Sequence, residues 1–180
     1  MNFMLELLPD SHVWWRIADL IWENPLDPCY AMGSGGRWNT PNSFPTLYLN
    51  EDQVTARMNL RAFIGRWPYE PEDLRSDTGP VLLGVELPRQ QQVVDVHSRE
   101  GVLAVGLPET YPLDRRRQRV SHARCQPVGV GAKAAGLRGI RARSAQSPDG
   151  AGRELAWFPA NQRSVARLGA TLRFEEWYWR

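Results

Sequence analysis

The chain has 180 residues, of which 42% are hydrophobic and 23% charged, and its formal net charge is +2. This length and composition suit one globular domain that buries a core without help from a metal or a disulfide. The small net charge gives no reason to expect a polyanion partner. Cys29 and Cys125 lie far apart and lack a CxxC partner, so the sequence predicts no metal site and no disulfide framework.

The first residues do not resemble a signal peptide. Residues 1–8 are apolar, but they include Glu6, lack a basic n-region and run into Pro9. Elsewhere, no stretch approaches the roughly 18 apolar residues of a membrane span. We therefore expect a cytoplasmic protein that does not enter the membrane. A monomer and a homo-oligomer are both compatible with the sequence.

The first half of the chain shows signals for two strands and a helix. The apolar pattern predicts a strand over residues 13–17, then a loop broken by prolines and glycines, and a second strand over residues 46–49. A helix follows over residues 54–64. Asn50, with a glutamine three residues later, is typical of its N-cap.

In the second half of the chain, the expected strands and helices follow one another in no regular order. Strands are expected over residues 81–87, 92–96, 137–142, 154–158 and 171–177, helices over residues 98–105 and 120–135, and a turn over residues 147–152. Ser98 is expected to cap the first of these helices. The mixture is not a regular βαβ repeat, so it predicts an α+β fold.

Two polar or glycine-rich segments could indicate a nucleotide or a nucleic acid, but each has a simpler interpretation. Residues 129–136 are glycine-rich and include Lys133, yet their spacing fits neither the Walker A motif nor GxGxxG. The arginine cluster at residues 115–119 is more typical of a solvated face than of a nucleic-acid site. Direct nucleic-acid binding is therefore not our first expectation.

Two further groups are expected to be structural. Trp14 and Trp15, like the aromatic residues 177–179, suit packing better than a binding stripe. Glu175 and Glu176 would face opposite sides of a strand, so we expect them to shield a sheet edge and not to form a catalytic pair.

The most informative run is Gly-Gly-Arg-Trp-Asn at residues 35–39, followed by Tyr48 at the next strand. Glycines let the backbone approach a ligand, and the planar guanidinium of Arg37 matches phosphate oxygens. The ring of Tyr48 offers a face to a base or a pyridine. A guanidinium group beside an aromatic ring predicts a nucleotide site.

Together with Arg16 and Ser144, this run resembles the ordered signature of the RES family, named for its Arg, Glu and Ser and known as toxins of bacterial toxin–antitoxin pairs. Arg16 matches the early arginine, Arg37 the second arginine, Tyr48 the tyrosine and Ser144 the late serine. The resemblance covers about residues 14–158.

The resemblance implies a single RES-like domain over residues 1–180, with an ADP-ribosyltransferase-like fold of twisted, mainly antiparallel strands and a few short helices around an NAD cleft. NAD would be a substrate, consumed by hydrolysis, phosphorolysis or ADP-ribosyl transfer, and no metal would be needed. Arg16 and Arg37 would bind the pyrophosphate, Tyr48 would stack near the nicotinamide, and Ser144 would bond to ribose or phosphate. An Xre-type antitoxin would be the protein partner.

One position departs from the family. The family places its glutamate on the helix after the tyrosine, where this chain has Asn59, so the implied catalytic set is Arg37, Asn59 and Ser144. Asn59 can hold a ribose hydroxyl but supplies no charge. Glu51 lies eight helical residues away, or roughly 12 Å along the axis, so it cannot simply replace the glutamate. Three outcomes stay open: a weaker activity, an activity that depends on another carboxylate such as Glu154, or a lost activity.

Two other functions stay open. Asn59 favours a catalytically silent RES-like protein that binds NAD, another nucleotide or a partner, and residues 115–119 alone favour a nucleic-acid-binding domain. On the enzyme interpretation, we expect Asn59→Glu to raise turnover and Arg37→Ala to abolish NAD binding.

Overall fold

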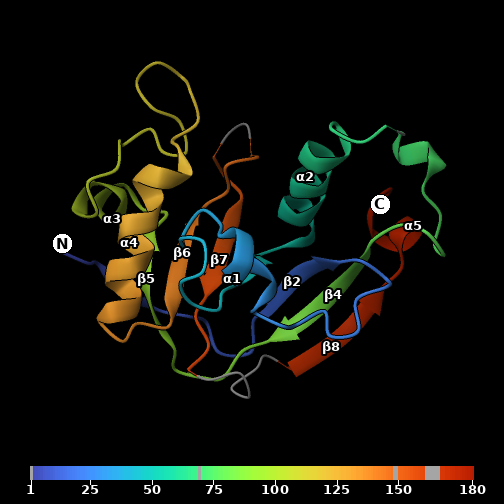
Figure 1. Ribbon diagram of the computed structural model, residues 1–180, viewed down its shortest axis with the longest axis horizontal. Helices are drawn as coiled ribbons and strands as arrows, with labels where there is room; N and C mark the ends of the chain where they lie inside the picture. Colours follow the sequence, from blue (N-terminus) through green and yellow to red (C-terminus); the bar gives the residue numbers. More distant parts are fainter. Residues whose placement is uncertain (1, 69, 148–149, 161–166) are drawn as a thin grey trace.

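The computed structural model describes residues 2–68, 70–147, 150–160 and 167–180, and within them the backbone forms one sheet of eight strands (Figure 1). The strands are β1 (Leu5–Leu7), β2 (Val13–Ala18), β3 (Leu47–Asn50), β4 (Val81–Glu86), β5 (Gln92–Val96), β6 (Gly139–Arg143), β7 (Arg153–Trp157) and β8 (Arg167–Leu172). Their order is β1-β5-β6-β7-β3-β2-β4-β8. Neighbouring strands are antiparallel except β5 and β6, which are parallel. The expected α+β class is confirmed.

Short helices cover parts of this sheet. They are α1 (Tyr30–Ser34), α2 (Gln53–Ile64), α3 (Arg99–Ala104), α4 (His122–Ala134) and α5 (Phe174–Trp177), with a 3₁₀ turn at Pro71–Asp73. In Figure 1, α3 and α4 lie beside β5 and β6, whereas α2 stands near β2 and β3. None of the helices in the described ranges is long and apolar enough to cross a membrane.

The C-terminal segment differs from its prediction as a strand over residues 171–177. The strand β8 ends at Leu172, and the chain then turns into α5. Phe174 and Trp177, three residues apart, share one face of α5, and both are buried. Glu176 accepts a hydrogen bond from the backbone nitrogen of Arg173 at 2.6 Å. The acidic pair therefore lies in the first turn of a helix and does not shield a sheet edge.

The start of α2 also differs from its prediction. Asp52 is the N-cap, and its Oδ1 accepts a hydrogen bond from the backbone nitrogen of Thr55 at 2.6 Å. Asn50, predicted as the cap, is instead the buried last residue of β3. Its side chain is thereby free to serve the polar network described below.

The two faces of the sheet bury different residues of the same strand. In β3, Leu47 and Leu49 belong to the hydrophobic cluster on one face, whereas Tyr48 packs against the cluster beneath α3 and α4. Because side chains alternate along a strand, Asn50 points to the same face as Tyr48. A separate cluster lies beneath α2 and α5. Tyr48 and Asn50 therefore lie on the helix-covered face of the sheet.

The tryptophans mainly form the core, as expected from their size. Trp14 and Trp177 are fully buried, and Tyr178 joins the cluster beneath α5. Trp15 packs against that same cluster from β2. Trp179 is the exception, because about half of its surface is exposed (49%).

The glycine-rich segment belongs to α4 and contacts the backbone of the 35–39 run. A Cβ on Gly129 would overlap the carbonyl oxygen of Trp38, so the absent side chain lets α4 pack directly on that backbone. We expect Gly129→Ala to lower the free energy of unfolding by about 2 kcal/mol, as overpacked core substitutions do. Chemical denaturation monitored by circular dichroism measures this change.

Gly131, in the same helix, is the matched control. Its added Cβ would meet only the ring end of Phe3, at 3.3 Å, and alanine favours a helix by about 1 kcal/mol over glycine. We expect Gly131→Ala to leave stability unchanged or raise it. Equal losses in the two variants would contradict the close packing of α4 on Trp38.

Candidate functional site

A cavity opens where β2 and β3 separate. These neighbours are joined at one register position, Trp15 with Asn50, whereas β2 pairs with β4 from Val13 to Ala18. The space left beside the pair forms a cavity of about 170 Å³. Its polar and aromatic lining includes Arg16, Trp22, Tyr48, Asn50, Asn59 and Glu154.

Arg16 is a buried cation in this lining, with 8% of its surface exposed. Its Nε donates to the carbonyl oxygen of Pro25 at 2.5 Å, and its Nη1 donates to that of Tyr48 at 3.1 Å. The guanidinium also lies over the ring of Trp22, 5.5 Å from its centroid. Burial lowers the pKa of Arg16 to about 10, although Tyr30 opposes the shift. Arg16 therefore stays charged at neutral pH, and no described carboxylate lies within ion-pair distance of it.

Tyr48 fixes the backbone of the 35–39 run. Its hydroxyl donates to Oδ1 of Asn39 at 2.8 Å and accepts from the backbone nitrogen of Trp38 at 2.9 Å. Burial raises the pKa of this hydroxyl, so it remains a neutral donor. Gly35 caps α1 with a φ of 71°, a conformation that favours glycine. The Tyr48 hydroxyl thus holds the loop in place, and Tyr48 also lines the first cavity.

Arg37 lines a second cavity, of about 350 Å³, next to the first. Its Nη1 donates to the carbonyl oxygen of Val120 at 2.8 Å. Burial acts to lower the pKa of Arg37, but Tyr111, Cys125 and Glu154 outweigh it and the net shift is upward. As with Arg16, no carboxylate in the described ranges forms an ion pair with it.

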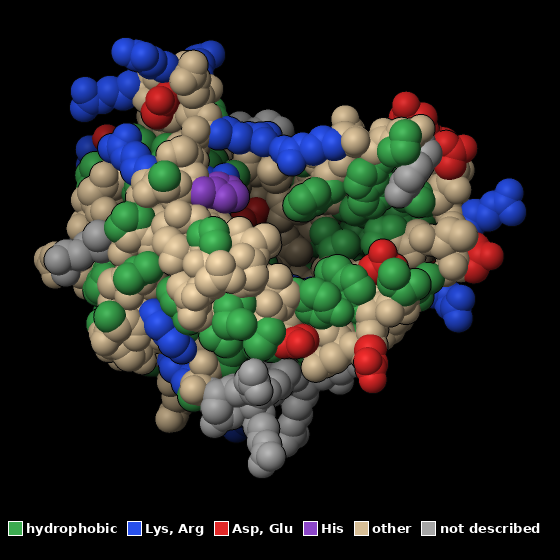
Figure 2. Space-filling view, in the orientation of Figure 1, with side chains coloured by type: hydrophobic (Ala, Val, Ile, Leu, Met, Phe, Trp, Pro, Cys, Tyr) green, Lys and Arg blue, Asp and Glu red, His purple; other side chains and the backbone are tan. Residues whose placement is uncertain are grey.

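The cavities adjoin one another and form a cleft. Phe63 lines both the first and the second cavity. Arg119 and Gln146 line the second and also a third, larger one of about 580 Å³. Figure 2 shows this face hollowed, with basic side chains and a histidine at the rim. The cleft therefore consists of three adjoining cavities, and its lining is rich in basic side chains.

A polar network forms one wall of the first cavity. Asn59 Nδ2 donates to Asn50 Oδ1 at 2.6 Å and to Glu154 Oε1 at 2.9 Å. Ser144 Oγ donates to the same Glu154 oxygen at 2.5 Å and lies 3.2 Å from Asn59 Oδ1. Asn50 Nδ2 in turn donates to the carbonyl oxygen of Trp15 at 3.1 Å. The network joins α2, β3 and β7 to the residue that follows β6.

The residues predicted from the sequence therefore meet, but not all in the same way. Arg16, Tyr48 and Asn59 line the first cavity, and Arg37 lines the second. Ser144 lies behind the cavity wall, with 0% of its surface exposed. Its hydroxyl contacts Glu154 and Asn59, so in this structure it does not face the cavity directly.

Several lining residues were not predicted. Trp22 and His122 lie in segments that gave no functional signal, and Asn50 was interpreted as a helix cap. Partial burial, reinforced by the charge of Arg37, lowers the pKa of His122 and keeps its imidazole neutral at pH 7. Of the arginines at residues 115–119, Arg119 reaches the cleft, while the side chains at 115–117 are exposed.

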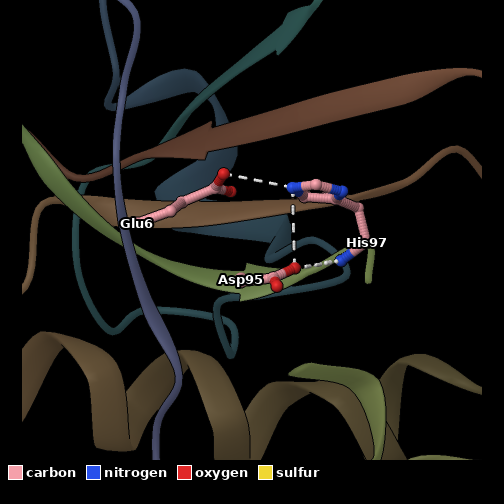
Figure 3. A group of neighbouring side chains, drawn as sticks. All are labelled: Glu6, Asp95 and His97. Carbon is pink, nitrogen blue, oxygen red and sulfur yellow. Dashed lines mark hydrogen bonds and ion pairs between the residues drawn. The ribbon is translucent and has the colours of Figure 1, made fainter. Parts of the chain in front are cut away.

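A separate polar cluster joins β1 to the end of β5. Glu6, Asp95 and His97 each offer a possible ligand atom, and these atoms lie within 4.8 Å of one another (Figure 3). His97 Nε2 lies 3.1 Å from Glu6 Oε2, and Arg141 Nη1 donates to that same oxygen at 3.0 Å. The guanidinium already supplies a positive charge to the group, so we interpret it as an ion-pair network between strands.

Comparisons with known proteins bear on the family and the fold of the chain. The RES domain family model matches residues 13–179. A chain of the crystal structure of the M. tuberculosis MbcT–MbcA toxin–antitoxin complex superimposes with a TM-score of 0.73 at 20% sequence identity, covering 99% of this chain and 92% of that one. No curated protein sequence matches. The match to the solved structure establishes a shared fold.

Proposed function

The chain belongs to the RES family, and on that premise we propose that it is a toxin that consumes NAD by breaking the bond between nicotinamide and ribose. The main support for this proposal is that two arginines, Arg16 and Arg37, line the cleft. Among the described residues, neither arginine has a carboxylate partner at ion-pair distance. An unpaired, buried cation is costly. A diphosphate would supply the missing negative charge to both.

We assign the parts of NAD to places in the cleft from the chemistry of its lining. The guanidinium forks of Arg16 and Arg37 suit bidentate bonds to phosphate oxygens. The ring of Tyr48, whose hydroxyl is already bonded to Asn39, would lie beside the nicotinamide. Asn59 and Ser144 would act from the polar wall, Asn59 toward a ribose hydroxyl and Ser144 as the residue that orients this wall.

The chemistry needs charge stabilisation more than acid catalysis. When the bond from ribose C1 to the pyridinium nitrogen breaks, its electron pair neutralises that nitrogen, and the ribose becomes an oxocarbenium ion. A carboxylate about 4 Å away at an effective dielectric near 20 stabilises this ion by roughly 4 kcal/mol. Water or phosphate then forms the new bond to C1. When water is the acceptor, the products are ADP-ribose, nicotinamide and a proton.

Incubation of the purified protein with NAD tests the proposal directly. We expect nicotinamide release, measured by liquid chromatography, with ADP-ribose as coproduct in water and a phosphorylated ADP-ribose in phosphate buffer if phosphate is the acceptor. Radiolabel from NAD on protein would identify a protein acceptor instead.

Two outcomes would contradict the proposed enzymatic activity. NAD that binds but is not cleaved would indicate a silent binding protein. Salt-sensitive oligonucleotide binding without any effect on NAD would favour the exposed arginines at 115–117 as a nucleic-acid site.

We further propose that an antitoxin, of Xre type by resemblance, is the protein partner and covers the cleft. The structural match to a chain from a toxin–antitoxin complex supports such a partner.

A further inference from the structure

We propose that Glu154 is the catalytic carboxylate of this enzyme and that Asn59 is its positioning residue. The inference rests on the proposed function and deepens it. Because the family glutamate position on α2 holds Asn59, the negative charge must come from another strand or helix. The structure assigns it to β7.

Glu154 is suitably placed and available for this role. Its Oε1 accepts hydrogen bonds from Asn59 Nδ2 at 2.9 Å and from Ser144 Oγ. Its other oxygen, Oε2, accepts none from any described residue. Glu154 lines the cavity that also contains Arg16 and Tyr48. One oxygen is thus held by the protein, and the other is open to a ligand.

The other acidic candidates are already engaged or lie elsewhere. Both oxygens of Glu51 bind the guanidinium of Arg141, at 2.6 and 2.9 Å. Among the described residues that line the three adjoining cavities, Glu154 is the one carboxylate. The cleft otherwise presents arginines, histidines and neutral groups.

Sheet register explains how two distant positions reach the same point. Asn50 on β3 pairs directly with Glu154 on β7. The chain leaves β3 at Asn50 and soon enters α2, which carries Asn59 back over that register position, where it bonds to both Asn50 and Glu154. A carboxylate on either position 59 or position 154 therefore reaches the same wall of the cavity. The two positions can exchange their roles.

In the reaction, Glu154 acts through its charge and not by proton transfer. Its free oxygen faces the ribose as the bond from C1 to nitrogen breaks, and it stabilises the positive charge that moves from the pyridinium to the sugar. Nicotinamide leaves neutral with the electron pair of that bond. The acceptor, water or phosphate, supplies the new oxygen on C1, and its proton is released to solvent.

The first experiment removes the charge and keeps the shape. We expect Glu154→Gln to reduce the rate of nicotinamide release by about 1,000-fold, while the affinity for NAD, measured by isothermal titration calorimetry, changes by less than about 3-fold because the arginines that bind phosphate remain. Glu100→Gln, an exposed carboxylate in α3, is the control and should match the wild type.

The second experiment exchanges the two side chains. Asn59→Glu alone places a second carboxylate within hydrogen-bond reach of Glu154, and like charges so close disfavour both, so turnover should fall at least about 10-fold. Glu154→Asn alone loses the charge. The double variant, Asn59→Glu with Glu154→Asn, should recover to within about 10-fold of the wild type, a non-additive result that a merely structural role would not give.

The possible failures can be told apart. A wild type that releases no nicotinamide would overturn the proposed function and this inference with it. An active wild type whose Glu154→Gln variant is equally active would overturn this inference alone. If a single variant unfolds, as shown by its melting curve, the double variant decides: a folded double variant whose turnover stays more than about 10-fold below the wild type overturns the exchange.

Discussion

Replacing Arg37 with alanine is expected to weaken NAD binding by about 100-fold or more. A guanidinium makes up to two charge-assisted bonds to a diphosphate, each contributing about 1.5 kcal/mol or more. Arg37 is well placed to make them, because its hydrogen bonds to the carbonyl oxygen of Val120 and to Cys125 Sγ orient the side chain without supplying a carboxylate. Its loss removes charge from the cleft but little packing from the core.

Calorimetric titration with NAD measures this loss, and a melting curve checks that the fold is retained. Arg116→Ala is the matched control, since the Arg116 side chain is exposed on the loop before α4, and its affinity should equal that of the wild type. An unchanged affinity in Arg37→Ala would show that the phosphates of NAD lie elsewhere, and our placement of the site would be wrong.

The main strands and helices could be predicted because their apolar patterns are local. The strands β2 and β5 and the cap of α3 by Ser98 follow directly from such patterns. The elements that were missed or wrong are short. The three residues of β1 and the five of α1 give too few periods to recognise, and α5 depends on packing between Phe174 and Trp177 that only the tertiary fold provides.

The candidate site was predictable as a set of residues but not as an arrangement. Arg16, Arg37 and Tyr48 carry a chemical signature that is visible in sequence. That Glu154 faces Asn59 depends on the pairing of β3 with β7, which brings together residues about a hundred positions apart. No local pattern encodes that register, so the sequence could name Glu154 only as one possible carboxylate.

The contact between Asn59 and Glu154 also changes the expected effect of a substitution. From sequence alone, Asn59→Glu restores a missing charge and is expected to raise turnover. In the structure, the amide nitrogen of Asn59 lies 2.9 Å from a carboxylate that already faces the cavity. A second negative charge there would be repelled, so the single substitution should lower turnover and only the exchange should preserve it.

A single methyl group on Gly36 is expected to reduce NAD affinity and turnover by about 100-fold, an effect comparable to the loss of Arg37. An added Cβ would overlap the hydroxyl of Tyr48, which is held by Asn39 and Trp38. Either the ring or the loop must then move, and the loop carries Arg37. Gly36→Ala therefore disturbs Arg37 and Tyr48, two groups that we propose to contact NAD, without removing any side chain.

Gly33 supplies the matched control, because it lies in α1 just before the same loop, and a Cβ there meets nothing within 4 Å. Gly33→Ala should bind and cleave NAD like the wild type. Gly33→Ala should unfold near the wild-type temperature, whereas Gly36→Ala should unfold at a lower one, because the Tyr48 ring that its Cβ overlaps packs against the cluster beneath α3 and α4. If Gly36→Ala bound NAD normally, the contact between the Tyr48 hydroxyl and the loop would have no part in holding Arg37 at the cleft.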